Sequence, residues 1–475
     1  MRFLKAALRL TVLALPAVYC LRWAAIRLRR ILLHSTADST PPIGPEQVEP
    51  RMRRVIISDL HIGAGDRLDD FDADTELAAF IRSYVAGAQP TELILAGDTF
   101  EFLQVRLPDL SDFEWSGAAA ARRLSAILAA HPEPVTALRA FLDQPGNQLT
   151  LLIGNHDFEL HYAMAKAQLR EALGLAEGDG RLRFGLTYSG GGVYVDHGMQ
   201  FDPWNRFANV AGISEPFEVV RGTRMVKEVI NPLEDDPIEL APLIDNVKPG
   251  SAFFWYMLSL PRLRQPQGLR FAMRGLLLLA RVNALPRSYG IWTPSAPGPG
   301  EGEARNRRRN QRIVAFARVL ARRLQRQPPD TALAEIQQEA KRQLRREILE
   351  FEDAIVNGIA RIATTPAHKD TQLFVCGHTH SAQVVSLNDR QTYVNTGTWT
   401  TIVLDIATRR HEEQRFPFLE IQYAADSPTP QGRLLVWRSD NAEPHPWRMV
   451  AQLRRAASEP GPTASLDRQD SKTSG

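Results

Sequence analysis

Short apolar runs alternate with polar stretches along much of the chain. From Arg53 onward each run is rich in β-branched residues or leucine, has the length of a strand, and is followed by a glycine or a turn. Between the early runs, "DADTELAAFIRSYVAG" and "AARRLSAILAA" space their apolar residues as amphipathic helices do. The order strand, helix, strand, helix predicts an α/β fold.

Five of these runs end on side chains that can bind a metal ion or carry a proton. The runs are "RRVIISDLHIG", "ELILAGDTFEF", "QLTLLIGNHDFEL", "GGVYVDHGMQF" and "QLFVCGHTHSA". In the same order, they end on Asp59 and His61, on Asp98 and Glu101, on Asn155, His156 and Asp157, on His197, and on His378 and His380. Because a sheet delivers its strand ends to one edge, where active sites gather, we expect these side chains to converge.

The mixture of oxygen ligands and imidazole suits Mn²⁺, Fe²⁺ or Zn²⁺. One D-x-H triplet, or one histidine beside a strand, is more often an ordinary polar feature, but five of the eleven histidines end apolar runs here. Two metals at about 3.5 to 4 Å need a bridging carboxylate, and this set can supply one. Two cations also ease attack on an anionic phosphodiester and make water acidic enough to supply hydroxide. No serine or cysteine nucleophile motif and no Walker-type phosphate loop offers a competing mechanism.

The ordered blocks D-x-H, G-D-x-x-D/E, G-N-H-D, H and G-H-x-H resemble those of the calcineurin-like metallophosphoesterase superfamily. The resemblance covers Arg53 to about Asp202 and Thr371 to about Ile406, where "YVNTGTWT" is similar to the closing strand and turn of that fold. It implies an α/β fold of the four-layer αββα sandwich type, two divalent metal ions and hydrolysis of a phosphoester. Mn²⁺ is the expected metal, with Fe²⁺ or Zn²⁺ as alternatives.

The resemblance also implies a role for each residue of the blocks. One metal would be held by Asp59, His61, Asp98 and His380, and the other by Asp98, Asn155, His197 and His378, with Asp98 as the bridge. His156 would stabilise the transferring phosphoryl group or protonate the leaving oxygen, and Asp157 would orient it. Glu101 stands where many relatives have aspartate and would support the ligands without being one.

Among relatives, "SDLH", "GDTFEF", "GNHDF" and "GHTH" look most like the UDP-2,3-diacylglucosamine hydrolase branch, which cleaves a pyrophosphate in a lipid precursor at a membrane surface. This resemblance implies a phosphodiester or pyrophosphate substrate that is linked to a lipid or to a nucleotide. The same core also suits a nuclease or a soluble cyclic-nucleotide or nucleotide phosphodiesterase. A non-catalytic scaffold is a third alternative, but every ligand position is filled.

The N-terminus joins a short apolar run to basic flanks. Leu10 to Leu21 is apolar, and seven basic residues surround it, namely Arg2, Lys5, Arg9, Arg22, Arg27, Arg29 and Arg30. The run is shorter than the roughly 20 residues of a spanning helix, so we expect a basic anchor on the cytoplasmic face of a membrane. A signal peptide or short span, a disordered leader, and a soluble cytoplasmic protein are the alternatives. Cys20 and Cys376 offer no disulfide framework.

Pro203 to Lys369 is a long insertion between the fourth and fifth blocks. It mixes large apolar residues with many arginines, is interrupted by the breaker "PSAPGPGEGE", and ends in a helical pattern that runs from Leu333 to Ile355. A helical lid that packs against the core is the default interpretation. A basic, apolar-faced lid could also contact an anionic membrane, and nucleic acid is a less favoured partner for its arginine face. The net charge of +3 is too small to choose between them.

These observations divide the chain into six segments. They are a membrane-proximal segment at 1–34, a linker at 35–52, the first part of the metallophosphoesterase core at 53–202, a helical insertion at 203–369, the second part of the core at 370–450, and a disordered tail at 451–475.

Overall fold

The computed structural model describes residues 34–85, 89–235, 250–284, 312, 315, 329–401, 403–405, 410–411, 415–438 and 443–448. The predictions for the N-terminal apolar run and for the tail at 451–475 therefore lie outside the described residues. So does most of the arginine-rich stretch between the breaker and the last long helix.

The larger of two facing sheets has seven strands in the order β16-β15-β14-β2-β3-β4-β5. Its parallel half consists of β2 (Arg53–Ile57), β3 (Thr91–Ala96), β4 (Gln148–Leu152) and β5 (Leu182–Gly185). Its antiparallel half consists of β14 (Pro417–Tyr423), β15 (Pro430–Val436) and β16 (His445–Pro446). The sheet thus joins strands from the two ends of the described chain.

The smaller sheet has five strands in the order β10-β11-β9-β7-β6. They are β6 (Thr187–Gly190), β7 (Val193–Asp196), β9 (Leu373–Cys376), β10 (Gln383–Ser386) and β11 (Thr392–Asn395). The central strand β9 pairs in parallel with both β7 and β11. Strands before and after the insertion therefore meet at the centre of this sheet.

Alternate side chains of the parallel strands serve two different interfaces. Ile56 and Ile94 enter a buried apolar cluster shared with Val195 and Val375 of the smaller sheet. Their neighbours Val55, Ile57, Leu93 and Leu95 point to the opposite face, as the two-residue period of a strand requires. A strand buried on both faces reads as a continuous apolar run, which is the pattern seen in the sequence.

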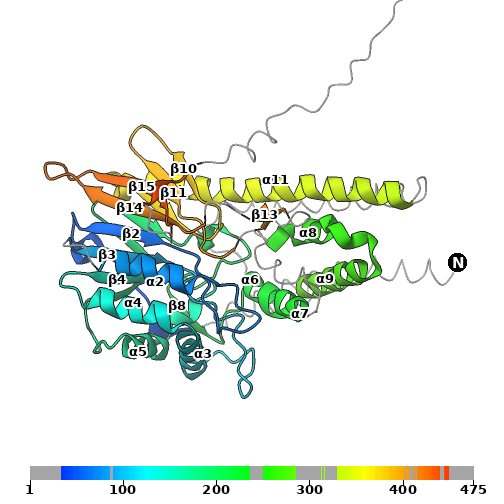
Figure 1. Ribbon diagram of the computed structural model, residues 1–475, viewed down its shortest axis with the longest axis horizontal. Helices are drawn as coiled ribbons and strands as arrows, with labels where there is room; N and C mark the ends of the chain where they lie inside the picture. The colour runs from blue at the N-terminus through cyan, green and yellow to red at the C-terminus, as the bar shows by residue number, and fades with distance from the viewer. Residues whose placement is uncertain are drawn as a thin grey trace, which may run out of the picture.

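Helices cover both outer faces, which gives the four layers α, β, β, α and confirms the predicted fold class (Figure 1). The larger sheet is covered by α2 (Asp74–Ser83), α3 (Gly117–Ala130), α4 (Pro132–Leu142) and α5 (Ala163–Ala172). The smaller sheet is covered by the C-terminal half of α11 (Pro329–Ala363), whose Phe351, Ile355 and Ile359 pack against Tyr194 and Phe374.

The N-terminal half of α11 reaches past the sheets to the other helices of the insertion (Figure 1). Those helices are α6 (Arg221–Met225), a π-helical turn at Val226–Ile230, α7 (Asn231–Glu234), α8 (Phe253–Ser259) and α9 (Pro266–Ala284). Their shared core contains Val229, Phe253, Met257 and Phe271. The helical pattern predicted from Leu333 to Ile355 is confirmed as part of α11.

The structure differs from the sequence prediction at residues 35–52, which were expected to form a linker. Strand β1 (His34–Ser39) pairs with β8 (Gly212–Glu215), and Ile43 and Val48 are buried in the cluster between the two sheets. This segment is therefore packed into the core, and β8 shows that the predicted insertion also contains a strand. The short elements that complete the described chain are β12 (Val403–Asp405), β13 (Arg410–His411) and the 3₁₀ turns Pro45–Gln47, Phe158–His161, Met199–Phe201, Gly250–Ala252, Pro261–Arg264 and Pro366–His368.

A buried histidine ties the loop after β2 to the outer helices. His131, between α3 and α4, lies with Nε2 2.8 Å from Asp69 Oδ2 and with Nδ1 2.7 Å from Asp74 Oδ1. Burial alone would lower the pKa of His131, but the hydrogen bonds to the two carboxylates raise it above the ordinary value of 6.5. Each ring nitrogen must carry a proton to donate to both carboxylates at once.

We predict that His131→Gln destabilises the protein most at low pH. Because the folded-state pKa lies above the unfolded one, the contribution of His131 is complete below about pH 6.5 and is lost as the pH rises through the folded-state pKa. The free energy of unfolding should fall by about 2 kcal/mol in the acidic range. Urea titrations of both proteins in EDTA, over a series of pH values, measure the difference. A difference that stays constant or widens with pH would contradict the assignment.

Candidate metal centre

The residues that end the apolar runs meet where the two sheets deliver their strand ends. Five of them have left-handed backbone conformations, with φ of 52° at Asp59, 49° at His61, 50° at Asp98, 69° at His378 and 60° at His380. Among the described residues, only Phe416 is another non-glycine residue with positive φ. Such conformations cost free energy and cluster at functional sites, where the surrounding fold maintains them.

Two glycines of the sequence blocks allow the close approach of these loops. A Cβ atom on Gly154 would lie 2.1 Å from Asp98 Oδ1, and one on Gly377 would lie 2.3 Å from Asp59 Oδ2. Neither neighbour is a flexible chain end, because both carboxylates are buried and held by backbone N–H groups. The glycines of G-N-H-D and G-H-x-H are thus required by contact with the neighbouring carboxylates.

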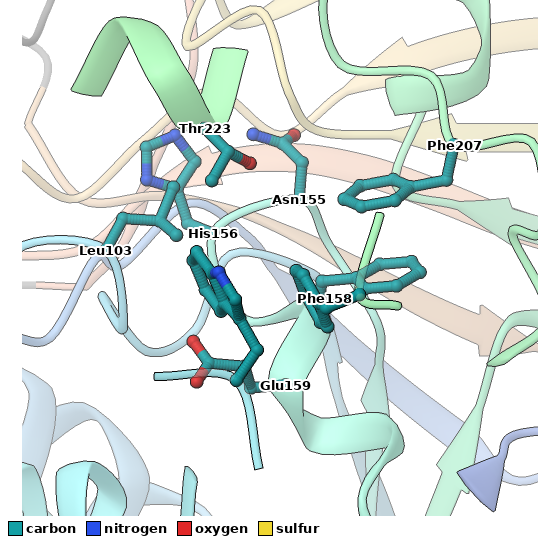
Figure 2. Close-up of a pocket in the computed structure, with 9 residues that line it drawn as sticks. Leu103, Asn155, His156, Phe158, Glu159, Phe207 and Thr223 are labelled. Atoms are coloured by element: carbon teal, nitrogen blue, oxygen red, sulfur yellow. The ribbon is translucent and has the colours of Figure 1, made fainter. Parts of the chain in front are cut away.

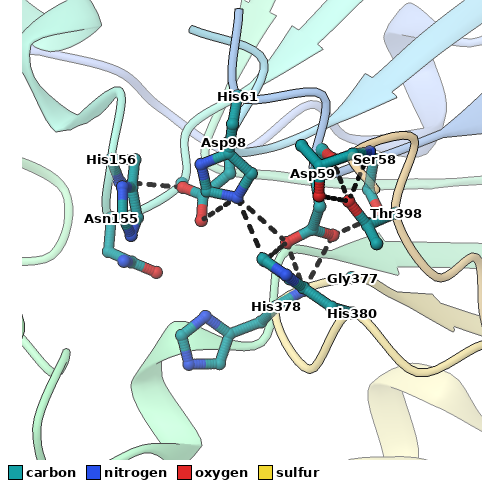
Figure 3. A network of polar contacts seen from close by, with 12 residues as sticks. Ser58, Asp59, His61, Asp98, Asn155, His156, Gly377, His378, His380 and Thr398 are labelled. Carbon is teal, nitrogen blue, oxygen red and sulfur yellow. Dashed lines mark hydrogen bonds and ion pairs between the residues drawn. The ribbon is translucent and has the colours of Figure 1, made fainter. Parts of the chain in front are cut away.

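One group of potential ligands consists of Asp59, His61 and His380, whose ligand atoms lie within 4.8 Å of one another. The Nε2 atoms of the two histidines are 3.0 Å apart, and His380 Nε2 is 3.4 Å from Asp59 Oδ1. The backbone N–H of His378 donates to Asp59, and Ser58 Oγ donates to Asp59 Oδ2 at 2.5 Å (Figure 3). The carboxylate is therefore fixed before any ligand binds.

A second group consists of Asp98, His197 and His378, again with ligand atoms within 4.8 Å of one another. His197 Nε2 lies 3.1 Å from Asp98 Oδ2 and 3.2 Å from Asn155 Oδ1. The structure thus brings together the residues of each predicted metal site, including the amide of Asn155.

Asp98 lies between the two groups. Its Oδ1 accepts a hydrogen bond from the backbone N–H of His156 at 2.8 Å, and its Oδ2 is 3.1 Å from His197 Nε2 and 3.8 Å from His61 Nε2. Within the described part of the chain, the buried Oδ2 atom accepts no hydrogen bond. This oxygen faces a histidine of each group, which is the position of a carboxylate that bridges two metal ions. The residues therefore fit a pair of divalent cations.

Charge in the centre is balanced between carboxylates and imidazoles. Burial alone would raise the pKa of Asp98, but His197, His156 and His61 hold it well below its ordinary value. Burial would likewise lower the pKa of His197, but Asp98 and Asp59 raise it to about 9. Because metal ligands must be deprotonated, the binding of a cation here would release protons.

Two histidines are oriented by contacts on their outer nitrogens. His61 Nδ1 lies 2.9 Å from Glu101 Oε2, and His197 Nδ1 lies 3.1 Å from the carbonyl oxygen of Ala96. In both rings Nε2 is therefore the nitrogen directed to the centre, which is the usual arrangement around bound metals. His378 Nε2 lies 3.3 Å from Asp202 Oδ2, a buried carboxylate that the sequence reasoning missed. Ser58 was missed as well, although both residues directly adjoin the recognised blocks.

Glu101 connects a potential ligand to the predicted catalytic histidine. Its Oε2 lies 2.9 Å from His61 Nδ1 and 2.5 Å from His156 Nδ1. Burial alone would raise the pKa of Glu101, but His156 and His61 lower it to about 2, so the group is ionised at neutral pH. One carboxylate therefore orients both rings.

This arrangement corrects the predicted role of Asp157, which was expected to orient His156. Asp157 Oδ1 accepts the backbone N–H of Gly154 at 2.6 Å, and Oδ2 accepts that of Thr99 at 2.7 Å. Burial, with a further contribution from the charge of Asp98, raises the pKa of Asp157 to about 7. Asp157 thus holds the loops after β3 and β4 together, and Glu101 is the carboxylate on the His156 ring.

The insertion contacts the loop that carries Glu101. Glu101 Oε1 accepts the backbone N–H of Leu103 at 3.0 Å, and the carbonyl of Leu103 accepts hydrogen bonds from Lys227 Nζ at 3.2 Å and from Asn231 Nδ2 at 3.0 Å. Lys227 belongs to the π-helical turn, a feature that is frequent at functional sites. The insertion therefore helps to fix the carboxylate that orients His61 and His156.

A small pocket adjoins Asn155 and His156, and its 190 Å³ of space between atoms includes open solvent (Figure 2). Its remaining walls are Leu103, Trp115, Phe158, Glu159, Phe207, Phe217 and Thr223. Trp115 stacks on Phe217 with ring centroids 4.4 Å apart, and Phe158 stacks on Phe207. The side of the centre next to His156 is therefore mainly aromatic.

Two ligand groups with a buried carboxylate between them, at the strand ends of an αββα sandwich, are the arrangement expected of a metal-dependent phosphoesterase. Residues 52–248 match the family of calcineurin-like phosphoesterases. Residues 52–248 are therefore a calcineurin-like phosphoesterase domain, and the family of this domain consists of metal-dependent phosphoric ester hydrolases that bind two divalent metals. A search of curated proteins gave no match.

The family match confirms the predicted superfamily, while the resemblance to the UDP-2,3-diacylglucosamine hydrolase branch stays a prediction. The matched range continues beyond Asp202 into residues predicted as insertion, and it ends before His378 and His380. The structure brings these two histidines to Asp59 and Asp98 nonetheless. Among the described residues, no helix combines the length and apolarity needed to cross a membrane.

We predict that Glu101→Gln lowers turnover about 10- to 100-fold and weakens metal binding, because the amide cannot hold both imidazole rings as the carboxylate does. Turnover and metal stoichiometry should be measured over a metal titration. Glu133→Gln, on the exposed side of α4, is the matched control and should behave as the natural protein. Normal turnover of Glu101→Gln at all metal concentrations would show that the two contacts are dispensable.

Proposed function

We propose that the enzyme hydrolyses a phosphodiester or pyrophosphate with two divalent cations, Mn²⁺ first and Fe²⁺ or Zn²⁺ as alternatives. Asp59, His61, Asp98 and His380 would hold one cation, and Asp98, Asn155, His197 and His378 the other. The observation that carries this proposal is the position of Asp98 Oδ2 between His61 Nε2 and His197 Nε2. When bound, the cations would neutralise phosphate charge and acidify water.

His156 would act on the substrate and not on a metal. Its Nδ1 is held by Glu101, and its backbone N–H is held by Asp98. A histidine paired with a carboxylate through one nitrogen can carry a proton on the other, which suits it to stabilise a phosphoryl oxygen or to protonate the leaving oxygen. The adjacent aromatic pocket would keep water away from that side of the reaction.

A lipid-linked substrate is our leading proposal, at the cytoplasmic face of a membrane. Support comes from the basic, apolar N-terminal sequence and from the arginines of the insertion. The alternative is a nucleotide-linked substrate, hydrolysed by a soluble nucleotide phosphodiesterase, or a nucleic acid cut by the same core. The aromatic walls next to His156 would suit a base as well as an apolar group, and they support this alternative.

Asp98→Asn should lose bound metal and nearly all activity, because a neutral amide cannot offset two divalent cations at close range. Hydrolysis of bis-p-nitrophenyl phosphate with Mn²⁺, together with metal analysis of the same sample, measures both effects. Asp143→Asn, at an exposed position after α4, is the control. Two bound metals and near-normal turnover in Asp98→Asn would refute the bridge, and an inactive natural protein would refute phosphodiester hydrolysis.

His156→Ala should keep both metals yet lose turnover about 100-fold or more on substrates with poor leaving groups. With good leaving groups the loss should be smaller, because protonation of the leaving oxygen then matters less. A series of aryl phosphodiesters of increasing leaving-group pKa measures the difference. Loss of metal from this variant would identify His156 as a ligand, and an equal loss on all substrates would exclude leaving-group protonation.

A further inference from the structure

Helix α9 has two faces of different character, both of them rich in apolar residues. One face, with Phe271, Ala272 and Val282, is buried in the core of the insertion. A Cβ atom on Gly275 of the same face would lie 2.7 Å from Met257 Cε, so this face packs closely against α8. Within the part of the chain that the structure describes, the core of the insertion therefore covers one side of the helix.

The opposite face of α9 exposes a row of large apolar side chains. Leu269, Met273 and Leu277 are 50%, 50% and 66% exposed, and their spacing of four residues places them along one side of the helix. Among the described residues, only Phe113, Met164 and Val384 are other large hydrophobic residues of this exposure, and these three lie far apart in the chain. Single exposed apolar residues are ordinary, but a row of three on one helix marks a contact surface.

Positive charge lies on the same exposed side. Arg270, Arg274 and Arg281 are exposed, and α9 contains no aspartate or glutamate. At 100° per residue, Arg270 and Arg274 border the row formed by Leu269, Met273 and Leu277 on one flank. An apolar row with a basic border is complementary to a surface that is apolar inside and anionic outside.

We propose that this face of α9, the row Leu269, Met273 and Leu277 with its arginine border, lies in the interface of an anionic lipid membrane. The helix is about 28 Å long, so it can lie flat with its aliphatic side chains among the acyl chains and its arginines at the headgroups. Nucleic acid offers no partner for three aliphatic side chains in a row, which separates this surface from a purely basic one. Figure 1 shows α9 in the part of the molecule away from the two sheets, where it can approach a flat surface.

The proposal deepens the lipid-linked substrate proposed above, since it gives the enzyme a way to reach a substrate held in a membrane. Docking itself does not depend on catalysis. Vesicle binding and hydrolysis are separate measurements, so either can fail while the other succeeds.

The test uses the full-length protein with Cys20 replaced by serine and a single new cysteine, Leu277→Cys, labelled with a polarity-sensitive fluorophore. Cys376 is buried and is not expected to react. Vesicles of phosphatidylcholine mixed with phosphatidylglycerol should shift the emission to the blue, and vesicles of phosphatidylcholine alone should shift it much less. The matched control is Met164→Cys on α5, at a position 53% exposed in the natural protein, which should not respond.

A second arm measures vesicle affinity. Met273→Gln should weaken binding to the anionic vesicles about fivefold to tenfold, through lost apolar burial, while Met164→Gln should leave it unchanged. Raised salt should weaken binding further, because the arginine contribution is screened.

Three outcomes would overturn the proposal. Labels at positions 277 and 164 could respond alike, or the protein could bind vesicles with no response at 277, which would assign binding to another segment. The label at 277 could also be shielded before vesicles are added, which would mean that another part of the chain or a second copy covers this face. Hydrolysis of bis-p-nitrophenyl phosphate by the same sample shows independently whether the proposed reaction holds.

Discussion

The placement of the Asp98 carboxylate is the constraint on which the centre depends. Its two oxygens make different contacts. Oδ1 accepts a hydrogen bond from the backbone N–H of His156, and Oδ2 faces a histidine of each ligand group. This placement requires left-handed backbone at Asp98 and no side chain at Gly154. The strained backbone of Asp98 and the glycine at position 154 thus have the same cause. The loops after β3 and β4 must approach each other closely at the cation site.

Burial of four carboxylates around this position would be unfavourable without compensation. Asp59, Asp98 and Glu101 are ionised beside histidines, whereas Asp157 accepts only backbone hydrogen bonds from the described residues and has a pKa of about 7. The difference follows from what each group faces, since an imidazolium favours the charged form and a neighbouring carboxylate disfavours it. Metal ions that bind here would therefore replace the positive charge that the protonated histidines supply to these carboxylates.

The sequence predicted the strands and the convergence of their end residues because both depend on local signals. Val55 and Ile56 belong to a β-branched apolar run of strand length, and Asp59 and His61 follow the end of that strand. The partner of His156 could not be predicted in the same way. Glu101 and Asp157 both lie near suitable strand ends, and only the three-dimensional path of each loop decides that Glu101 reaches the ring while Asp157 turns to Gly154 and Thr99.

Long-range pairings explain the other differences. The segment at 35–52 has the Pro, Ser and Thr content of a linker, yet β1 pairs with β8 about 180 residues further along the chain, as in the pairing of Ser35 with Ser214. No local sequence pattern predicts a strand partner at that distance. The contact of Lys227 and Asn231 with the carbonyl of Leu103 is of the same kind.

The contact of Lys227 and Asn231 with the carbonyl of Leu103 links the insertion to the proposed catalytic residues. Glu101 orients two histidines only if its own backbone is fixed, and the carbonyl of Leu103, two residues later, is held by side chains of the insertion. Lys227 is buried, and burial lowers its pKa to about 8, so its hydrogen bond is part of the packed interior and is not an exposed contact. A movement of the insertion large enough to break this contact would reach His156 through Leu103 and Glu101, a chain of three direct hydrogen bonds. The insertion is therefore connected to the metal centre by direct hydrogen bonds. The family match nevertheless covers only the N-terminal part of the insertion.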